Sequence, residues 1–240
     1  MKTIKFILLS ISVLFLLVST SCIDNFSIRG NGIKESESRF AQNFNKVKSS
    51  GAFNIHISNS NEYEVVINAE TNILPYIETE VNGSTLNISI RGVHNLRNTL
   101  PMDVYISTPV LEGLKLSGSG EIITDYFVSN NMDVTVSGSG LIETAVDCHL
   151  FEATVSGSGM VYVSGVADNS KIKISGSGKV DSYDMIVKDC DANISGSGDI
   201  YANIERLLDA SISGSGSVFY IGSPDINAHI SGSGKIINDN

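Results

Sequence analysis

Apolar and polar residues alternate strictly before each copy of a repeated Ser-Gly-Ser-Gly motif. The chain reads Leu114-Lys115-Leu116, Val134-Thr135-Val136 and Ile172-Lys173-Ile174, and the other four copies follow the same pattern. A β-branched residue stands two positions after every motif, in the series Ile122, Ile142, Val161, Val180, Ile200, Val218 and Ile236. Period-two alternation puts the apolar side chains on one face of a strand, where β-branched residues pack well. The pattern predicts strands on both sides of a glycine-rich corner.

The spacing of the motif predicts the fold class. The seven copies begin at Ser117, Ser137, Ser156, Ser175, Ser195, Ser213 and Ser231, so neighbouring copies are 18 to 20 residues apart. This length matches one coil of a parallel β-helix and is shorter than the common helical repeats or propeller blades. The chain is therefore expected to be an all-β solenoid with 18–20-residue coils. Seven coils spaced by about 4.8 Å would make a rod of roughly 30 Å.

The N-terminal half is less regular but also predicts strands. Alternating segments suggest strands over 44–49, 53–58, 62–69, 76–81, 85–90 and 102–107, and Asn82-Gly83 is a hairpin-type turn. Terminal repeats of solenoids are usually atypical because they cap the core. Residues 40–240 are thus expected to be one β-helix domain, with irregular coils over 40–116 and repeats over 117–240. Residues 22–39 would be a tether ending in a first strand, and 203–209 one short helical turn.

The Ser-Gly-Ser-Gly motif has two interpretations. If the alternation continues through it, the glycines point inward and the serines outward, giving two stacked columns of hydroxyls. One interpretation is a tight corner that any β-helix needs, and the other is a ligand-facing strip. The strip would contain Ser117, Ser119, Ser137, Ser139, Ser156, Ser158, Ser175, Ser177, Ser195, Ser197, Ser213, Ser215, Ser231 and Ser233.

The first residues resemble an export signal. Lys2 and Lys5 precede an apolar run over 6–18, which is too short to span a bilayer, and Cys22 follows three small residues. This arrangement resembles the looser bacterial lipobox, in which the signal, here 1–21, is removed and the cysteine is acylated. The expected location is the outer membrane, as a lipoprotein on the surface or the periplasmic face. The alternative is an ordinary secretory signal with Cys22 as an incidental thiol.

Charge and composition narrow the classes of partner. Lys and Arg number 16 and Asp and Glu 26, which gives a net charge of −10. An acidic chain without a basic stripe argues against nucleic-acid binding and against polybasic attachment to anionic lipid. Membrane contact is therefore expected through acylated Cys22 alone.

No motif indicates catalysis, a metal or a cofactor. His56, His94, His149 and His229 lack metal-ligand spacing, and His56 and His229 are expected to face solvent. Cys148 and Cys190 fall on coils two apart and at different phases, so no disulfide is expected. Many parallel β-helices are polysaccharide-active, and five carboxylates lie on neighbouring coils, but a solvated acidic face is the favoured explanation of them. They are Asp181, Asp184, Asp189, Asp191 and Asp199.

Several segments together resemble a known family. They are 28–32 (Ile-Arg-Gly-Asn-Gly), Arg39-Phe40, 44–47 (Phe-Asn-Lys-Val), 51–53 (Gly-Ala-Phe) and 72–77 (Asn-Ile-Leu-Pro-Tyr-Ile). With the Ser-Gly-Ser-Gly series, they are similar to the "putative auto-transporter adhesin, head GIN domain" family, mostly Bacteroidetes lipoproteins. The resemblance covers about 28–237. It implies a right-handed β-helix and carries over no catalytic residue. Only 235–240 follow the last motif, which leaves no room for an autotransporter's own membrane barrel.

The sequence thus favours a lipid-anchored, non-catalytic and adhesin-like module of the cell envelope. Its ligand would be a glycan or a protein, met by outward columns of Ser, Thr and Lys. The alternatives are a structural envelope protein without a soluble ligand and, less favoured, a polysaccharide-active enzyme. Exposed coil ends would also allow a head-to-head homodimer.

Overall fold

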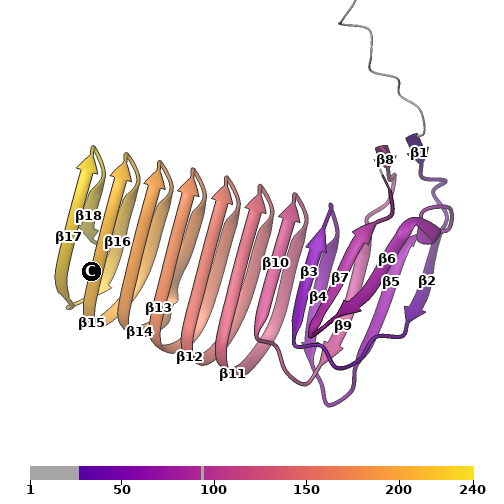
Figure 1. The fold of residues 1–240 in the computed structure, drawn as a ribbon, viewed down its shortest axis with the longest axis horizontal. Helices are drawn as coiled ribbons and strands as arrows, with labels where there is room; N and C mark the ends of the chain where they lie inside the picture. The colour runs from indigo at the N-terminus through magenta and orange to yellow at the C-terminus, as the bar shows by residue number, and fades with distance from the viewer. Residues whose placement is uncertain (1–26, 93–94) are drawn as a thin grey trace, which may run out of the picture.

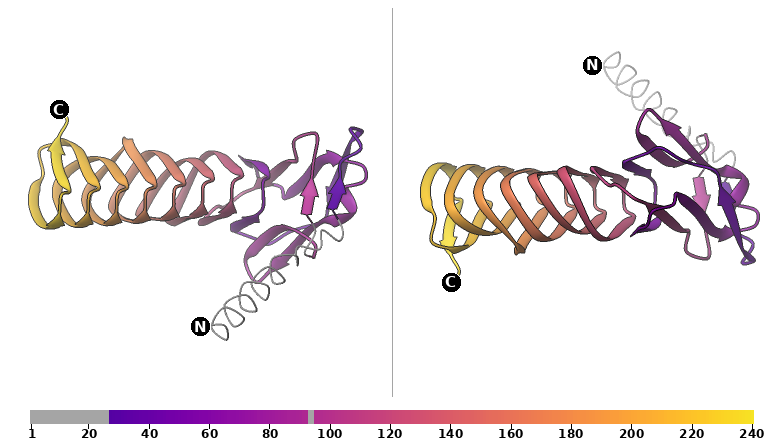
Figure 2. Two further views of the ribbon diagram at one scale, coloured as in Figure 1. Left: turned by 90° about the horizontal axis from the view of Figure 1, so that it is seen from above. Right: turned by 90° about the horizontal axis from the view of Figure 1, so that it is seen from below.

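The chain folds into a parallel β-solenoid, which Figure 1 shows as a rod of stacked coils. The structure is a computed structural model and describes residues 27–92 and 95–240. The expected signal peptide, Cys22 and His94 lie outside these residues. Figure 2 shows the regular coils following one another along a single axis, with the N-terminal strands wound less evenly. The all-β solenoid predicted from the repeat is confirmed.

The described residues contain eighteen strands and one short 3-10 helix. The N-terminal half holds β1 (Ser27–Arg29), β2 (Lys34–Arg39), β3 (Lys46–Ser50), β4 (Asn54–Asn59), β5 (Glu64–Glu70), η1 (Leu74–Tyr76), β6 (Ile77–Asn82), β7 (Thr85–Ile90), β8 (Asn95–Arg97) and β9 (Asp103–Thr108). The repeats hold β10 (Gly113–Gly118), β11 (Glu121–Gly138), β12 (Leu141–Gly157), β13 (Met160–Gly176), β14 (Lys179–Gly196), β15 (Asp199–Gly214), β16 (Ser217–Gly222), β17 (Asp225–Gly232) and β18 (Lys235–Asn238).

Neighbouring coils pair in parallel and keep the repeat in register. Each of β11 to β15 is one long, bent strand that makes a whole coil. Ser137 pairs with Ser156 and Ser156 with Ser175, and the same match continues along the rod. Equivalent residues therefore form straight columns, which is how a solenoid builds its core.

The inward columns form a continuous apolar core. The residues expected to point inward before the motifs are at most 3% exposed from β11 to β15; they are Val134, Val136, Ala153, Val155, Ile172, Ile174, Ala192, Ile194, Ala210 and Ile212. The β-branched residues after the motifs are buried in the first six copies, and Ile236 in the last coil is partly buried. Burying such side chains stabilises the fold by about 1.5–3 kcal/mol each.

The Ser-Gly-Ser-Gly motif is a corner, and its two glycines differ. The first glycine ends each long strand with φ between +110° and +130°, a left-handed conformation that L side chains rarely adopt. Its carbonyl accepts the N–H of the second Ser of the following coil, as in Ser177 to Gly157 at 2.9 Å. The second glycine is buried in the first six copies, whereas no first glycine is. The expectation that both point inward is wrong for the first, because its positive φ interrupts the alternation.

The N-terminal half joins the same sheet but mixes strand directions. β3 pairs in parallel with β10, and β4 with β11, so the repeats continue into it. β2–β5, β5–β9 and β6–β7 are antiparallel, and β6–β7 is the hairpin predicted at Asn82-Gly83. The predicted strands match β3, β4, β5, β6, β7 and β9 within two residues at each end. Within the segment expected to be a tether, β1 and β2 are already paired.

The short helical turn expected over 203–209 is wrong. These residues lie inside β15, where Ile204 and Leu208 are buried under the neighbouring coils. Glu205 and Arg206 are both exposed between them, and the register with β14 shifts at this point. A bend in the strand therefore explains the break in alternation that suggested a turn.

We expect Gly176→Ala to destabilise the fold, because a Cβ there would lie 2.6 Å from the Gly157 carbonyl oxygen and φ is +119°. The predicted loss is about 1–3 kcal/mol in the free energy of unfolding, measured by urea denaturation. Ser177→Ala, at the neighbouring exposed corner position, should change it by less than about 0.5 kcal/mol. Equal losses for the two variants would contradict this account of the corner.

Candidate functional site

One outward-facing column carries three of the eight aromatic residues of the repeats, Tyr162, Tyr201 and Phe219. It stands three residues after each motif, and the strand register extends it into the N-terminal half. In order along the rod it contains Tyr105, His56, Ile123, Glu143, Tyr162, Asp181, Tyr201, Phe219 and Ile237. We call it the outward aromatic column. This column was not predicted from the sequence, because the predicted outward columns were only those within the motif and directly before it.

The C-terminal part of this column is closely packed. The rings of Tyr201 and Phe219 are stacked, with centroids 4.7 Å apart and planes inclined by 5°. The Lys179 ammonium lies 4.4 Å from the Tyr201 ring centroid and forms a 2.9 Å ion pair with Asp181. The hydrogen bond to Asp181 raises the pKa of Lys179 against the opposing effect of burial. Stacking and the cation–π contact thus engage the Tyr201 ring within the protein.

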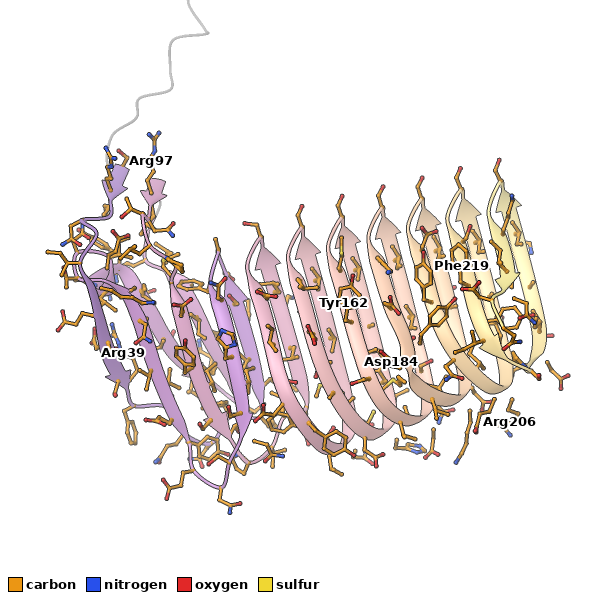
Figure 3. All side chains as sticks on the ribbon, turned by 180° about the vertical axis from the view of Figure 1, so that it is seen from behind. Arg39, Arg97, Tyr162, Asp184, Arg206 and Phe219 are labelled. Atoms are coloured by element: carbon orange, nitrogen blue, oxygen red, sulfur yellow. The ribbon has the colours of Figure 1, made fainter. Side chains whose placement is uncertain are left out.

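A shallow depression lies next to this packed segment. It has a volume of about 390 Å³ and is lined by Glu143, Thr144, Tyr162, Val163, Ser164, Asp181 and Asp184. We call it the Tyr162 depression. Figure 3 shows Tyr162, Asp184 and Phe219 on one broad face of the rod, with Arg206 at its lower edge. Tyr162 is 36% exposed, and the Lys179 ammonium lies 5.4 Å from the centroid of its ring, so the ring is partly open to a ligand.

The depression combines an aromatic ring with three carboxylates. β12 supplies Glu143, β13 supplies Tyr162, and β14 supplies Asp181 and Asp184, so neighbouring coils build it together. An aromatic ring packs against apolar C–H surface, and ionised carboxylates accept strong hydrogen bonds from hydroxyl or amine donors. Such a surface can hold a ligand that has both apolar faces and many donors.

The columns of Ser, Thr and Lys proposed from the sequence lie elsewhere on the rod. Lys48 pairs with Lys115, and the column continues through Thr135, Thr154 and Lys173. Shallow hollows of about 230 and 370 Å³ lie over this column. Its residues precede the motif, whereas the Tyr162 depression follows it. The solenoid therefore presents two chemically different faces.

The fourteen corner serines lie at the surface, and the seven first serines form one of the two expected rows. The first serines pair from coil to coil, and the register continues this row through Ser50 to Ser89. None of the described residues forms a side-chain hydrogen bond with these hydroxyls, which stay partly or fully exposed. Since the corner backbone pairs between coils, the geometry accounts for the motif as a corner. Ligand binding by the serines stays a prediction.

The five carboxylates considered for an enzyme groove do not form one cluster. Asp181 and Asp184 share the Tyr162 depression, but Asp189 is paired with Arg206. Asp191 accepts a hydrogen bond from the Asn193 amide at 2.6 Å. Asp199 accepts the N–H of Ser217 at 3.0 Å and lies outside the depression.

The three histidines that the structure describes lie apart from one another and form no metal site. His56 stacks on Tyr105 with ring centroids 5.2 Å apart, His149 contacts Asp168 at 2.7 Å, and His229 is exposed as expected. His56, expected to face solvent, is outward but partly covered. Among the described residues no group of three or more His, Cys, Asp or Glu could hold a metal ion.

The two described cysteines are free and buried, in agreement with the prediction that they form no disulfide. The strand register aligns Cys190 with Ser170 on β13 and Phe151 on β12, not with Cys148. Burial raises the pKa of both thiols to about 11. Both thiols are therefore protonated at neutral pH, which makes them poor nucleophiles.

The most strongly shifted carboxylate belongs to a structural clamp. Glu70 is 1% exposed, and its carboxylate accepts hydrogen bonds from the N–H of Gly32 at 2.6 Å and of Thr99 at 2.8 Å. The Thr99 hydroxyl and the Leu100 N–H donate at 2.5 and 3.3 Å. Burial raises the pKa of Glu70, but these hydrogen bonds, led by the Thr99 hydroxyl, outweigh it and lower the pKa to about 2. The clamp holds the loops beside β1 and β8.

Comparisons with known proteins identify the family. A family model described as "Putative auto-transporter adhesin, head GIN domain" matches residues 43–224. The chain belongs to this family. The prediction made from the sequence is thus confirmed at the level of the family. No protein among the curated ones matches the chain. In the part of the chain that the structure describes, no helix is long and apolar enough to span a bilayer.

Crystal structures of similar proteins show the same solenoid. A "putative adhesin" from Bacteroides fragilis is 26% identical, with a TM-score of 0.82, and the match covers 88% of this chain and all of that one. A "putative lipid binding protein" from Parabacteroides distasonis is 24% identical, with a TM-score of 0.73 and the same coverage. A "putative adhesin" from Parabacteroides merdae is 18% identical, with a TM-score of 0.72, covering 89% and 100%.

The clamp involves two of the segments that resemble this family. Asn72 accepts a hydrogen bond from the Asn31 N–H at 3.1 Å and donates one to the Arg29 carbonyl at 2.8 Å. A Cβ at Gly30 would collide with the Glu70 carboxylate. Gly30 is therefore required by the packing around Glu70, which gives a structural reason for this part of the motif.

We expect Glu70→Gln to lower the melting temperature at pH 7, because an amide nitrogen would face backbone donors. The folded-state pKa of about 2 lies below the ordinary value of 4.5. The ionised carboxylate therefore stabilises the fold above about pH 4.5, and this contribution is lost as the pH falls through about 2. Thermal melts of both proteins should converge over this interval. A difference that stays constant from pH 7 to pH 2 would contradict the clamp.

Proposed function

We propose that this protein is a lipid-anchored, non-catalytic module of the cell envelope that binds a glycan at the Tyr162 depression. The observation that carries the proposal is the combination of a partly exposed Tyr ring with Glu143, Asp181 and Asp184 on neighbouring coils. A sugar ring has apolar C–H faces and a rim of hydroxyls, so it can pack on the ring and donate to the carboxylates. The family description as an adhesin is consistent with binding at an envelope surface.

The shape of the site favours binding over catalysis. Glycosidases hold the glycosidic bond between two carboxyl groups in a cleft, where one group protonates the leaving oxygen and the other acts as base or nucleophile. The Tyr162 depression is shallow, and it is built from coil strands without a long loop that would wall it. Hydrolysis of a polysaccharide by the protein would instead support the enzyme alternative, with Asp181, Asp184 and Asp199 as the candidate catalytic carboxylates.

The anchor would act at the N-terminal end of the rod. Four residues separate Cys22 from Ser27, the start of β1, so the chain takes five steps between them, and an extended chain spans at most about 3.6 Å per step. An acylated Cys22 would thus hold β1 within about 18 Å of the lipid. Figure 1 shows β1 and β8 projecting from the N-terminal end, away from the coils that carry the depression.

We expect Cys22→Ser to move the protein from the membrane fraction to the soluble fraction, because the thiol is the site of acylation. In cells fed an alkyne fatty acid, the natural chain should be labelled and the variant unlabelled. Ser21→Ala, at the adjacent position, serves as the control and should stay labelled. An unlabelled natural chain would favour the ordinary secretory signal.

Native affinity electrophoresis of residues 23–240 in gels cast with bacterial and host polysaccharides tests glycan binding. Retardation without loss of polymer is the expected result. Tyr162→Ala should weaken it by about tenfold, which corresponds to about 1.4 kcal/mol, the upper range for one aromatic contact. Tyr126→Ala is the matched control, since Tyr126 is 50% exposed and outside the depression.

Other outcomes would redirect the assignment. Loss of binding on Lys115→Ser, with Tyr162→Ala unchanged, would move the site to the face of Thr and Lys columns. A cleared zone around the band would indicate an enzyme. No retardation in any gel would contradict glycan binding and favour a protein ligand or a structural envelope role.

A further inference from the structure

The C-terminal end of the solenoid leaves its core uncovered. In β17 the inward residues Ile226 and Ile230 are each 42% exposed. Their partners in the preceding coil, Leu208 and Ile212, are at most 1% exposed because β17 covers them. The columns that are buried throughout the repeats therefore end in open apolar side chains. Figures 1 and 2 show this end without any covering element.

The backbone at this end is open as well. Among the described strands, β17 pairs only with β15, and β18 only with β16. Each therefore presents one edge with N–H and C=O groups available to another strand. All eight residues of β17 are exposed. Open edges of this kind readily pair with another chain unless charges or covering segments protect them.

Charged side chains protect the edge strand at the N-terminal end against pairing with another chain, whereas β17 at the C-terminal end lacks such protection on its inward side. The edge strand β2 pairs with β5, placing Glu35, Glu37 and Arg39 opposite the inward residues of that strand. These charged side chains therefore stand over the end of the core. Glu37 and Arg39 form a 3.1 Å ion pair, and Arg39 also donates to the Leu74 carbonyl at 3.3 Å. Inward-pointing charges on an edge strand oppose the addition of a further strand.

We propose that two copies of the chain associate through their C-terminal ends, with β17 of each pairing antiparallel to β17 of the other. The difference between the two ends selects this arrangement. Stacking the C-terminal end on the N-terminal end of another copy would bury the charges of β2 against apolar columns, which is costly. Two C-terminal ends instead offer the same apolar columns, so each covers the other in an isologous dimer.

The sequence of β17 suits this symmetry. An antiparallel register centred on Ala228 places Ile226 of one copy opposite Ile230 of the second copy, both on the inward side. The same register places Asn227 opposite His229 and Asp225 opposite Ser231. No like charges face each other, and the apolar side chains continue the core across the junction. The dimer would present two Tyr162 depressions, which can raise the avidity for a polymer.

The association can be tested with residues 23–240. Two solved relatives are covered over their whole length by 88% and 89% of this chain, so the same fold forms in them without a counterpart to the remaining residues. Light scattering after size exclusion should give twice the chain mass over a concentration series. Ile230→Lys should shift the dissociation constant upward by about tenfold or more. His229→Lys places the same charge on the outward side of the strand and should leave the mass unchanged. A monomer for the unaltered protein at every concentration would overturn the proposal.

Cross-linking tests the register. Ala228→Cys places one thiol beside its own counterpart, so mild oxidation should give a disulfide-linked dimer on a non-reducing gel. Asn227→Cys faces His229 of the second copy and should give much less. Equal cross-linking of both variants, or none in a protein that scattering shows to be dimeric, would overturn the β17 pairing. Thermal melts of each variant show whether it folds, and glycan binding is measured separately, so the two proposals can fail independently.

Discussion

Backbone pairing at the Ser-Gly-Ser-Gly corner determines the rest of the structure. The first glycine of each motif turns at positive φ, and its carbonyl accepts the N–H of the second serine in the following coil. A side chain at this glycine would collide with the backbone of the coil before it, as Gly176 shows. The corner thereby fixes the distance and the register between coils. Once corners are in register, the residues on either side of each motif stack on their equivalents, and shifts of register farther along the strands absorb the differences in coil length.

Much of the architecture follows from the sequence because this constraint repeats seven times. Alternation before the motif and β-branched residues after it identify the core, and both are confirmed. The alternation of apolar and polar residues did not predict that the first glycine turns away from the core, because such a pattern cannot reveal a positive φ. The clamp at Glu70 was also missed, because its partners are 29 to 38 residues away along the chain. The outward aromatic column could have been predicted from the sequence, because its residues stand three positions after each motif.

The same constraint separates folding from function. Most inward positions hold apolar residues that fill a column, with a few small polar ones such as Thr144 and Ser170, whereas outward positions are free of this demand. The outward aromatic column accordingly changes from Ile123 to Glu143, Tyr162 and Asp181, although these four residues pair in series from coil to coil. A recognition surface can therefore vary over a constant core. The Tyr162 depression is such a surface, because no single coil contains all of its side chains.

The two ends of the rod differ in how the last coil of the solenoid is covered. Each coil is stabilised by the coil on either side, so a terminal coil lacks half of its burial and exposes a strand edge. The N-terminal end meets this demand within the chain, through antiparallel strands, inward charges on β2 and the buried Glu70 carboxylate. Among the described strands, β17 and β18 form the last coil of the C-terminal end, where Ile226 and Ile230 are exposed. One end of the rod thus has a protected edge, and the other end has an apolar one. A contact that covers the apolar edge explains this difference better than the idea that exposed core residues are tolerated at both ends.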